Sequence, residues 1–186
     1  MKILAVIPAR SGSKRLPKKN LARLGGDSLI KRSFDAVKGI KEVQDVLLSS
    51  DSEEIVRHGE NIGLLAPWLR PSELSDDSAK TTDVVIHALS WYQSKFKKID
   101  AVLVLQPTSP FRKKLSIRKA IDIMMDSKNL CDSVVSVSPT HTHPEWCFKY
   151  SKPFLQPFIK GDGLNKRSQD LEPAYNVNGN IYLVKT

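Results

Sequence analysis

Five cationic side chains lie close together near the start of the sequence, directly after a short apolar run. Residues 5–20 read AVIPARSGSKRLPKKN, and the cations are Arg10, Lys14, Arg15, Lys18 and Lys19. Arginine can bind a phosphate through its planar fork, and lysine can bind it as a point charge. The run is therefore compatible with a loop that holds the phosphates of a small molecule. It is equally compatible with a basic patch for nucleic acid or with a solvated surface turn.

The spacing within this segment favours the phosphate-binding interpretation. Ser11, Gly12 and Ser13 are small and let the backbone approach a ligand, although neither a GxxxxGK[ST] nor a GxGxxG pattern is present. Arg10 and Lys19 could bracket a triphosphate from the two ends of the loop. A position just after a predicted strand supports this interpretation over the solvated turn.

The segment LRPSELSDDSAKTT, residues 69–82, is rich in small polar side chains. Arg70 precedes a proline, which stiffens the backbone there. We expect Asp77 or Ser78 to cap the helix that follows, and a helix N-terminus attracts anions. Spacing alone favours an ordinary helix-capping loop at this place.

The segment LQPTSPFR, residues 105–112, follows the most apolar predicted strand. Gln106 offers a donor and an acceptor, Thr108 and Ser109 add hydroxyls, and two prolines restrict the loop. Such restriction suits a binding site, but the same composition also makes a plain turn.

A possible metal site at residues 141–147, HTHPEWC, is disfavoured. His141, His143 and Cys147 lack a fourth ligand and the usual zinc spacing. A substrate-facing loop or a subunit contact is the better interpretation of this segment.

Alternating strands and helices must position these loops. The pattern predicts strands over residues 2–7, 43–49, 101–105, 133–137 and 180–184. It predicts helices over residues 28–38, 81–95 and 116–126, and another that a capping-box-like Asp51 and Glu54 pair opens and that ends near Gly63. This order indicates an α/β fold of three layers, a Rossmann-like, open and mostly parallel sheet with helices on both faces. Ligands bind such sheets at the carboxyl ends of the strands.

Length and composition limit the classes of protein to which the chain can belong. The chain has 186 residues, which suits a single domain over residues 1–186, and 40% of them are hydrophobic. No run is long enough to span a membrane, no signal peptide is evident, and only two cysteines are present, so we expect a cytoplasmic protein. The formal charge of +9 favours an anionic partner. Nucleic acid is not expected, because no aromatic-interleaved basic stripe and no RNP, helix-turn-helix or zinc-finger pattern is present.

Five motifs in order resemble those of the CMP-sialic acid synthetases, also called acylneuraminate cytidylyltransferases. They are IPARSGSKRLPKKN, RPSELSDDSAKT, LQPTSPFR, RSQDL and NGNIYL, and they span essentially the whole chain. The resemblance implies a nucleotidyltransferase that transfers CMP from CTP to the anomeric hydroxyl of a nonulosonic, nine-carbon sugar acid and releases pyrophosphate. It also implies a homodimer and magnesium as the cofactor.

The resemblance assigns roles by motif. Arg10, Lys19 and Arg167 would be the catalytic residues, with Arg10 and Lys19 on the CTP phosphates. The nucleotide site would further include Ser13, Lys14, Asn20, Arg70, Ala79 and Thr81. The sugar-acid site would comprise Gln106, Thr108, Ser109 and Arg167.

Two features depart from the family pattern. The second arginine of the family's RRQD motif is Ser168 here, which puts part of the sugar-acid contact in doubt. The family's paired metal-binding aspartates lie beyond the NGxIY strand, and we expect this chain to lack that segment and its magnesium ligands. No D-x-D elsewhere replaces them, and Asp76 with Asp77 are interpreted as capping carboxylates.

Several alternatives stay open. Kdo cytidylyltransferases resemble the first loop but carry an acidic residue where this chain has LQPTSP. Legionaminic and pseudaminic acid cytidylyltransferases share most motifs, and the pseudaminic type diverges more at QPTSP, so sialic or legionaminic acid is favoured. A non-catalytic CTP-binding relative is a further alternative.

Overall fold

The fold is described by a computed structural model that covers residues 1–13, 16–126 and 130–186. These residues form two compact units. The first consists of Met1–Val135 with Gly179–Thr186, and the second is Ser136–Asn178. The single-domain organisation expected from the sequence stays a prediction.

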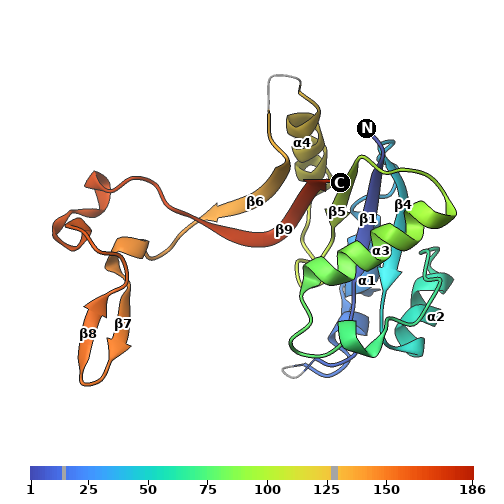
Figure 1. Cartoon of the computed structure of the whole chain (residues 1–186), viewed down its shortest axis with the longest axis horizontal. Helices are drawn as coiled ribbons and strands as arrows, with labels where there is room; N and C mark the ends of the chain where they lie inside the picture. The colour runs from blue at the N-terminus through green and yellow to red at the C-terminus, as the bar shows by residue number, and fades with distance from the viewer. Residues whose placement is uncertain (14–15, 127–129) are drawn as a thin grey trace. The chain divides into compact units, whose positions relative to one another are not determined.

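A five-stranded sheet in the order β4-β1-β5-β9-β6 is the centre of the first unit (Figure 1). The strands are β1 Ile3–Pro8, β4 Val43–Ser49, β5 Ala101–Val104, β6 Ser133–Pro139 and β9 Tyr175–Lys185. β1 runs parallel to both β4 and β5, whereas β9 runs antiparallel to β5. Three parallel strands therefore end at the same edge of the sheet.

β1 is buried on both of its faces. Residues Ile3 to Ile7 are all 0% exposed. Alternate side chains of this strand belong to different hydrophobic clusters, with Ala5 in one and Val6 in the other. A continuous apolar run is what a parallel strand covered on both sides requires.

Helices cover both faces of the sheet. They are α1 Leu29–Asp35, α2 Glu53–Asn61, α3 Thr81–Lys95 and α4 Lys114–Met125. Apolar residues of α1, α2 and α4 pack in one cluster, whereas α3 packs against the opposite face through Val84, Ala88 and Tyr92. The predicted three-layer α/β fold is confirmed.

Helix starts differ from the expectations in two places. Ser52, not Asp51, caps α2, because the Ser52 hydroxyl accepts from the Ile55 N–H at 3.4 Å. Lys80 occupies the cap position of α3 and makes no side-chain capping bond, so the cap predicted at Asp77 or Ser78 is wrong. Asp51 instead accepts hydrogen bonds from Ser11, and Asp77 pairs with Arg10.

Several elements were not predicted. β9 begins at Tyr175, five residues before the expected start at residue 180. Two short antiparallel pairs were also missed, β2 Arg23–Leu24 with β3 Asp27–Ser28 and β7 Phe148–Ser151 with β8 Phe154–Pro157. In the described part of the chain, no helix is long and apolar enough to cross a membrane.

The second unit contains the β7–β8 hairpin and several short 3-10 turns. Trp146 Nε1 donates to the carbonyl of Gly163, and the His143 ring bonds the carbonyl of Glu172 at 3.0 Å. Gly163 lies so close to Glu145 that an added β-carbon would be 2.3 Å from its carboxylate oxygen. Side-chain to backbone contacts, more than an apolar core, hold this unit together.

Candidate active site

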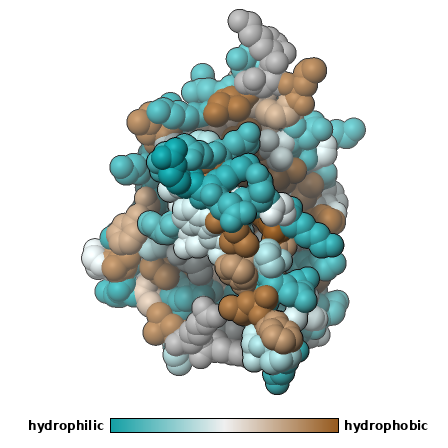
Figure 2. All heavy atoms as spheres, turned by 90° about the vertical axis from the view of Figure 1, so that its left-hand side faces the viewer, coloured by the Kyte–Doolittle hydropathy of each residue, from teal (hydrophilic) through white to brown (hydrophobic). Residues whose placement is uncertain are grey.

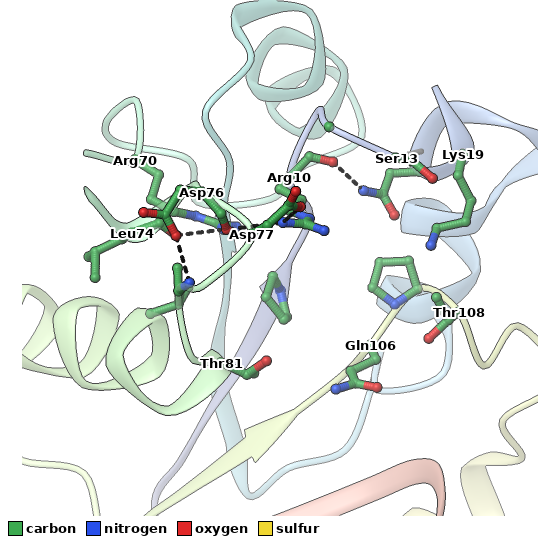
Figure 3. Close-up of a pocket in the computed structure, with 16 residues that line it drawn as sticks. Arg10, Ser13, Lys19, Arg70, Leu74, Asp76, Asp77, Thr81, Gln106 and Thr108 are labelled. Atoms are coloured by element: carbon green, nitrogen blue, oxygen red, sulfur yellow. Dashed lines mark hydrogen bonds and ion pairs between the residues drawn. The ribbon is translucent and has the colours of Figure 1, made fainter. Parts of the chain in front are cut away.

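A pocket of about 560 Å³ opens at the carboxyl ends of the parallel strands. Figure 3 shows Arg10 and Lys19 on one side of this space, with Thr81, Gln106 and Thr108 across from them. Most residues assigned from the motifs line it together, namely Arg10, Ser13, Lys19, Asn20, Arg70, Ala79, Thr81, Gln106 and Thr108. Segments far apart in the sequence thus meet where strands β1 and β5 end.

The basic loop after β1 presents only some of its cations to the pocket. Lys19 lines the pocket, whereas Lys18 turns to Glu54, with its Nζ 2.8 Å from the Glu54 carboxylate. Asn20 is buried, and its amide nitrogen donates to the Arg10 carbonyl at 2.8 Å, which ties the two ends of the loop together. The cations of this loop are therefore not equivalent.

Arg10 already has an acidic partner in this structure. Its guanidinium nitrogen lies 3.0 Å from the Asp77 carboxylate and donates to the Asp76 carbonyl at 3.0 Å (Figure 3). An anionic ligand at Arg10 would compete with Asp77 for the same cation.

Asp51 fixes the turn that follows Arg10. Its two carboxylate oxygens accept from the Ser11 N–H at 2.7 Å and from the Ser11 hydroxyl at 2.6 Å. Burial raises the pKa of Asp51, but these bonds and the nearby charge of Arg70 outweigh it, so the pKa lies below its ordinary value of 3.8. A carboxylate at the end of β4 thus sets the backbone of the basic loop.

Arg70 is a buried part of the pocket wall. It is 6% exposed, and its guanidinium donates to the Ser49 hydroxyl at 3.0 Å, to the Ser49 carbonyl and to the Leu74 carbonyl at 3.4 Å. Burial lowers the pKa of Arg70, and the charge of Asp51 opposes that shift. Arg70 holds the end of β4 to the loop before α3 as well as lining the pocket.

The loop before α3 is organised by Asp76. One of its oxygens accepts from the Ser78 N–H, the Ser78 hydroxyl and the Ala79 N–H at 2.7–2.8 Å. These bonds, the Ser78 hydroxyl first, lower the pKa of Asp76. The loop leads into Thr81, the first residue of α3, so the positive end of this helix faces the pocket.

Gln106 and Ser109 lie against β9. Ser109 N–H donates to the Gln106 carbonyl at 3.1 Å. Gly179 has a φ of +76°, and a β-carbon there would lie 3.3 Å from Ser109 Oγ and 3.5 Å from Gln106 Oε1. Ser109 is thus next to the pocket wall without being part of the lining.

The structure does not test the roles of two assigned residues. Lys14 lies outside the described residues. Arg167 belongs to the second unit, where its Nε donates to the Asp170 carboxylate at 2.8 Å. The roles assigned to both stay predictions.

The sequence reasoning missed Asp51, Asp76 and Asp77 as parts of this site. A carboxylate one or two residues past a predicted parallel strand, as Asp51 is past β4, was the available signal. The capping-box spacing with Glu54 concealed it.

Two carboxylates, Asp76 and Asp77, line the pocket. The described residues contain no group of three or more histidine, cysteine, aspartate or glutamate side chains placed to hold a metal ion. Of the pocket carboxylates, Asp76 accepts three hydrogen bonds and Asp77 pairs with Arg10. Both are engaged with the protein.

An open α/β sheet whose parallel strands end at a cation-lined pocket, beside the start of a helix, is typical of proteins that bind nucleotides. A family model described as cytidylyltransferase matches residues 4–150. The chain belongs to this cytidylyltransferase family.

Relatives of known function agree with the motif resemblance. The chain is 39% identical over 191 residues to a CMP-N,N'-diacetyllegionaminic acid synthase of Legionella pneumophila, covering 98% of this chain and 78% of that one. It is 35% identical to an N-acylneuraminate cytidylyltransferase of Streptococcus agalactiae, covering 98% of this chain and 43% of the relative. It is 33% identical to a pseudaminic acid cytidylyltransferase of Campylobacter jejuni, covering 98% and 78%. The resemblance is confirmed at the level of the family.

Solved structures support the fold. A CMP:2-keto-3-deoxy-manno-octonic acid synthetase complexed with CTP aligns with a TM-score of 0.72 at 19% identity, over 100% of this chain and 74% of that one. A 4-diphosphocytidyl-2C-methyl-D-erythritol synthase from Anaerococcus prevotii aligns with a TM-score of 0.65 at 15% identity, over 99% and 71%. At these identities the likeness shows the fold alone.

Asp51→Ala tests the link between β4 and the basic loop. Because the pKa of Asp51 is lowered on folding, its carboxylate stabilises the fold above pH 3.8, and this contribution is lost as the pH falls through the folded-state value. We expect the variant to be less stable than the wild type at pH 7, with a difference that shrinks below pH 3.8. Thermal unfolding across this pH range measures it.

Asp122→Ala, on the exposed face of α4, is the matched control. A pH-independent difference for Asp51→Ala, or an equal loss for both variants, would contradict the assignment.

Proposed function

We propose that this protein is a cytidylyltransferase that transfers CMP from CTP to a sialic-type nonulosonic acid and releases pyrophosphate. The observation that carries the proposal is the pocket itself, in which Arg10, Lys19, Asn20 and Gln106 meet at the ends of the parallel strands. Membership of the cytidylyltransferase family and the activities for which the relatives are named support the same reaction.

The proposed chemistry is an in-line displacement. The anomeric hydroxyl oxygen attacks the α-phosphorus of CTP, the bond to the β-phosphate oxygen breaks, and pyrophosphate departs while the hydroxyl proton is lost to water. Arg10 and Lys19 stabilise charge on the phosphates, and the start of α3 near Thr81 adds its dipole. Catalysis rests on alignment and on this cationic stabilisation.

Magnesium enters the proposal through the triphosphate. This ion is usually held by substrate phosphates and one or two carboxylates. In the proposed reaction the ion would be held mainly by the phosphates of CTP, and the role of magnesium stays a prediction.

Gln106 and Thr108 are the proposed contacts for the sugar acid, with Ser109 beside them. The sugar-acid role that the motif assigns to Arg167 stays a prediction. An amide and two hydroxyls can bond the hydroxyl and N-acyl groups of such an acceptor. N-Acetylneuraminic and N,N'-diacetyllegionaminic acids are the favoured acceptors, because the pseudaminic type diverges more at the QPTSP motif. The relatives named for diacetyllegionaminic and N-acylneuraminic acid are also 39% and 35% identical to the chain, against 33% for the pseudaminic acid relative.

A homodimer is part of the proposal. The β7–β8 hairpin exposes large apolar side chains. Figure 2 shows that brown, apolar residues lie at the surface among teal, polar ones on one face of the molecule. Phe154 is 71% exposed, Tyr150 67% and Leu155 63%. Soluble monomers rarely expose contiguous apolar patches of this kind, and a lone hairpin is only marginally stable. A second copy of the chain is the proposed cover.

A cytoplasmic location is also proposed. Cys131 and Cys147 are both free thiols, which suits a reducing compartment.

Alanine substitutions in the basic loop test the nucleotide site. We expect Arg10→Ala and Lys19→Ala each to weaken CTP binding by roughly tenfold or more, because a charge-assisted bond to phosphate is lost. Isothermal calorimetry measures the dissociation constants. Lys18→Ala is the matched control, since Lys18 pairs with Glu54, and equal effects from all three would restore the interpretation as a general basic patch.

Product formation tests the reaction. With CTP, magnesium and either favoured acid, we expect CMP-sugar and pyrophosphate in equal amounts, measured by coupled pyrophosphate release and chromatography. Competition between the two acids in one reaction decides which is preferred. CTP binding without turnover of any nonulosonic acid would leave a non-catalytic relative in place of the enzyme.

Phe154→Asp tests the dimer. We expect the wild type to sediment as a dimer and this variant to shift toward monomer, because a charge is buried at the proposed contact. Lys160→Asp, also exposed in the second unit, is the control. A wild type that sediments as a monomer at all concentrations would refute the dimer.

A further inference from the structure

Arg112, the last residue of LQPTSPFR, is buried beneath the pocket loop. It is 8% exposed although it carries a guanidinium group. Its terminal nitrogen donates to the Gln106 carbonyl at 3.0 Å, and its Nε donates to the Asn180 carbonyl on β9. One planar side chain therefore joins the pocket loop to the neighbouring strand.

The charge of Arg112 has no acidic partner among the residues that the structure describes. Burial alone lowers the pKa of Arg112 to about 10, so it is still a cation at neutral pH. Its second terminal nitrogen is buried without a hydrogen-bond partner in the described chain. A buried cation that is paired only with carbonyls costs stability, so a role other than stability is the more economical explanation for it.

β9, the strand that Arg112 joins to the pocket loop, has a left-handed backbone conformation next to Asn180. Gly179, the residue before Asn180, has a φ of +76°, and its missing side chain leaves room for Gln106 Oε1 and Ser109 Oγ. Gln106 is thus held through its carbonyl by Arg112 and has its side-chain amide beside Gly179. Both contacts act on one residue of the pocket.

We propose that Arg112 is a positioning residue for the acceptor sugar acid, holding Gln106 in its binding orientation while its uncompensated positive charge favours a carboxylate-bearing acceptor. This inference rests on the proposed function, because it concerns the acceptor half of that site. In the proposed function CTP is bound by Arg10 and Lys19 on the loop after β1, so the role of Arg112 is specific to the acceptor.

The variants Arg112→Lys and Arg112→Met separate two functions of Arg112, its hydrogen-bonded link between Gln106 and Asn180 and its positive charge. Lysine keeps the cation but cannot bridge both carbonyls as a planar fork does, and methionine removes both functions. We expect the KM for the sugar acid to rise by roughly tenfold or more in Arg112→Met and by less in Arg112→Lys, with the KM for CTP unchanged. A merely structural role would raise both KM values or lower kcat alone.

Arg118→Met, an exposed arginine of α4, is the matched control and should leave both KM values unchanged. Should Arg112→Met fail to fold, as judged by thermal unfolding, Arg112→Lys carries the test alone. An unchanged sugar-acid KM in the folded variants, or a parallel rise in the KM for CTP, overturns the inference.

A binding measurement keeps this inference separate from the proposed function. If the wild type turns over no nonulosonic acid, the proposed function fails. Saturation-transfer NMR of N-acetylneuraminic acid with the wild type and Arg112→Met then decides the inference. Binding that depends on Arg112 supports it, and absent or equal binding overturns it.

Discussion

The parallel pairing of β1 with both β4 and β5 is the constraint on which the rest of the structure depends. Ala5 is in register with Val46 on one side and with Leu103 on the other. This pairing brings the loops that follow β1, β4 and β5 to one edge of the sheet, where a ligand can contact residues from all three loops. Because both faces of β1 are buried, a slip in register would break two packed layers at once.

The fold was largely predictable because β1 and β5, at the centre of the sheet, are short and fully apolar. The predicted range of β4 matches the observed Val43–Ser49, and α3 has the predicted bounds Thr81–Lys95. The β7–β8 hairpin could not be predicted, since its side chains are exposed and show no buried face. Hydrophobic periodicity in a sequence indicates which face of an element is buried, and this hairpin has no buried face.

The motifs grouped residues that meet at one pocket, but they did not indicate the contacts among those residues. The motifs indicated Arg10, Lys19 and Gln106, and these side chains do share one pocket. The bonds between Asp51 and Ser11 join residues 40 positions apart, and the bond between Arg112 and Asn180 joins residues 68 positions apart. Local spacing carries no information about such pairs, and near Asp51 it favoured a helix cap.

The pairing of Arg10 with Asp77 has a consequence for turnover. A ligand phosphate at Arg10 replaces a carboxylate instead of meeting a free cation, so only the difference between the two interactions contributes to affinity. An anion with a single charge would gain little by this exchange, whereas a polyphosphate chain that also reaches Lys19 would gain more. In the proposed reaction, Asp77 would pair with Arg10 again as the product leaves, so the exchange that limits affinity would also favour product release.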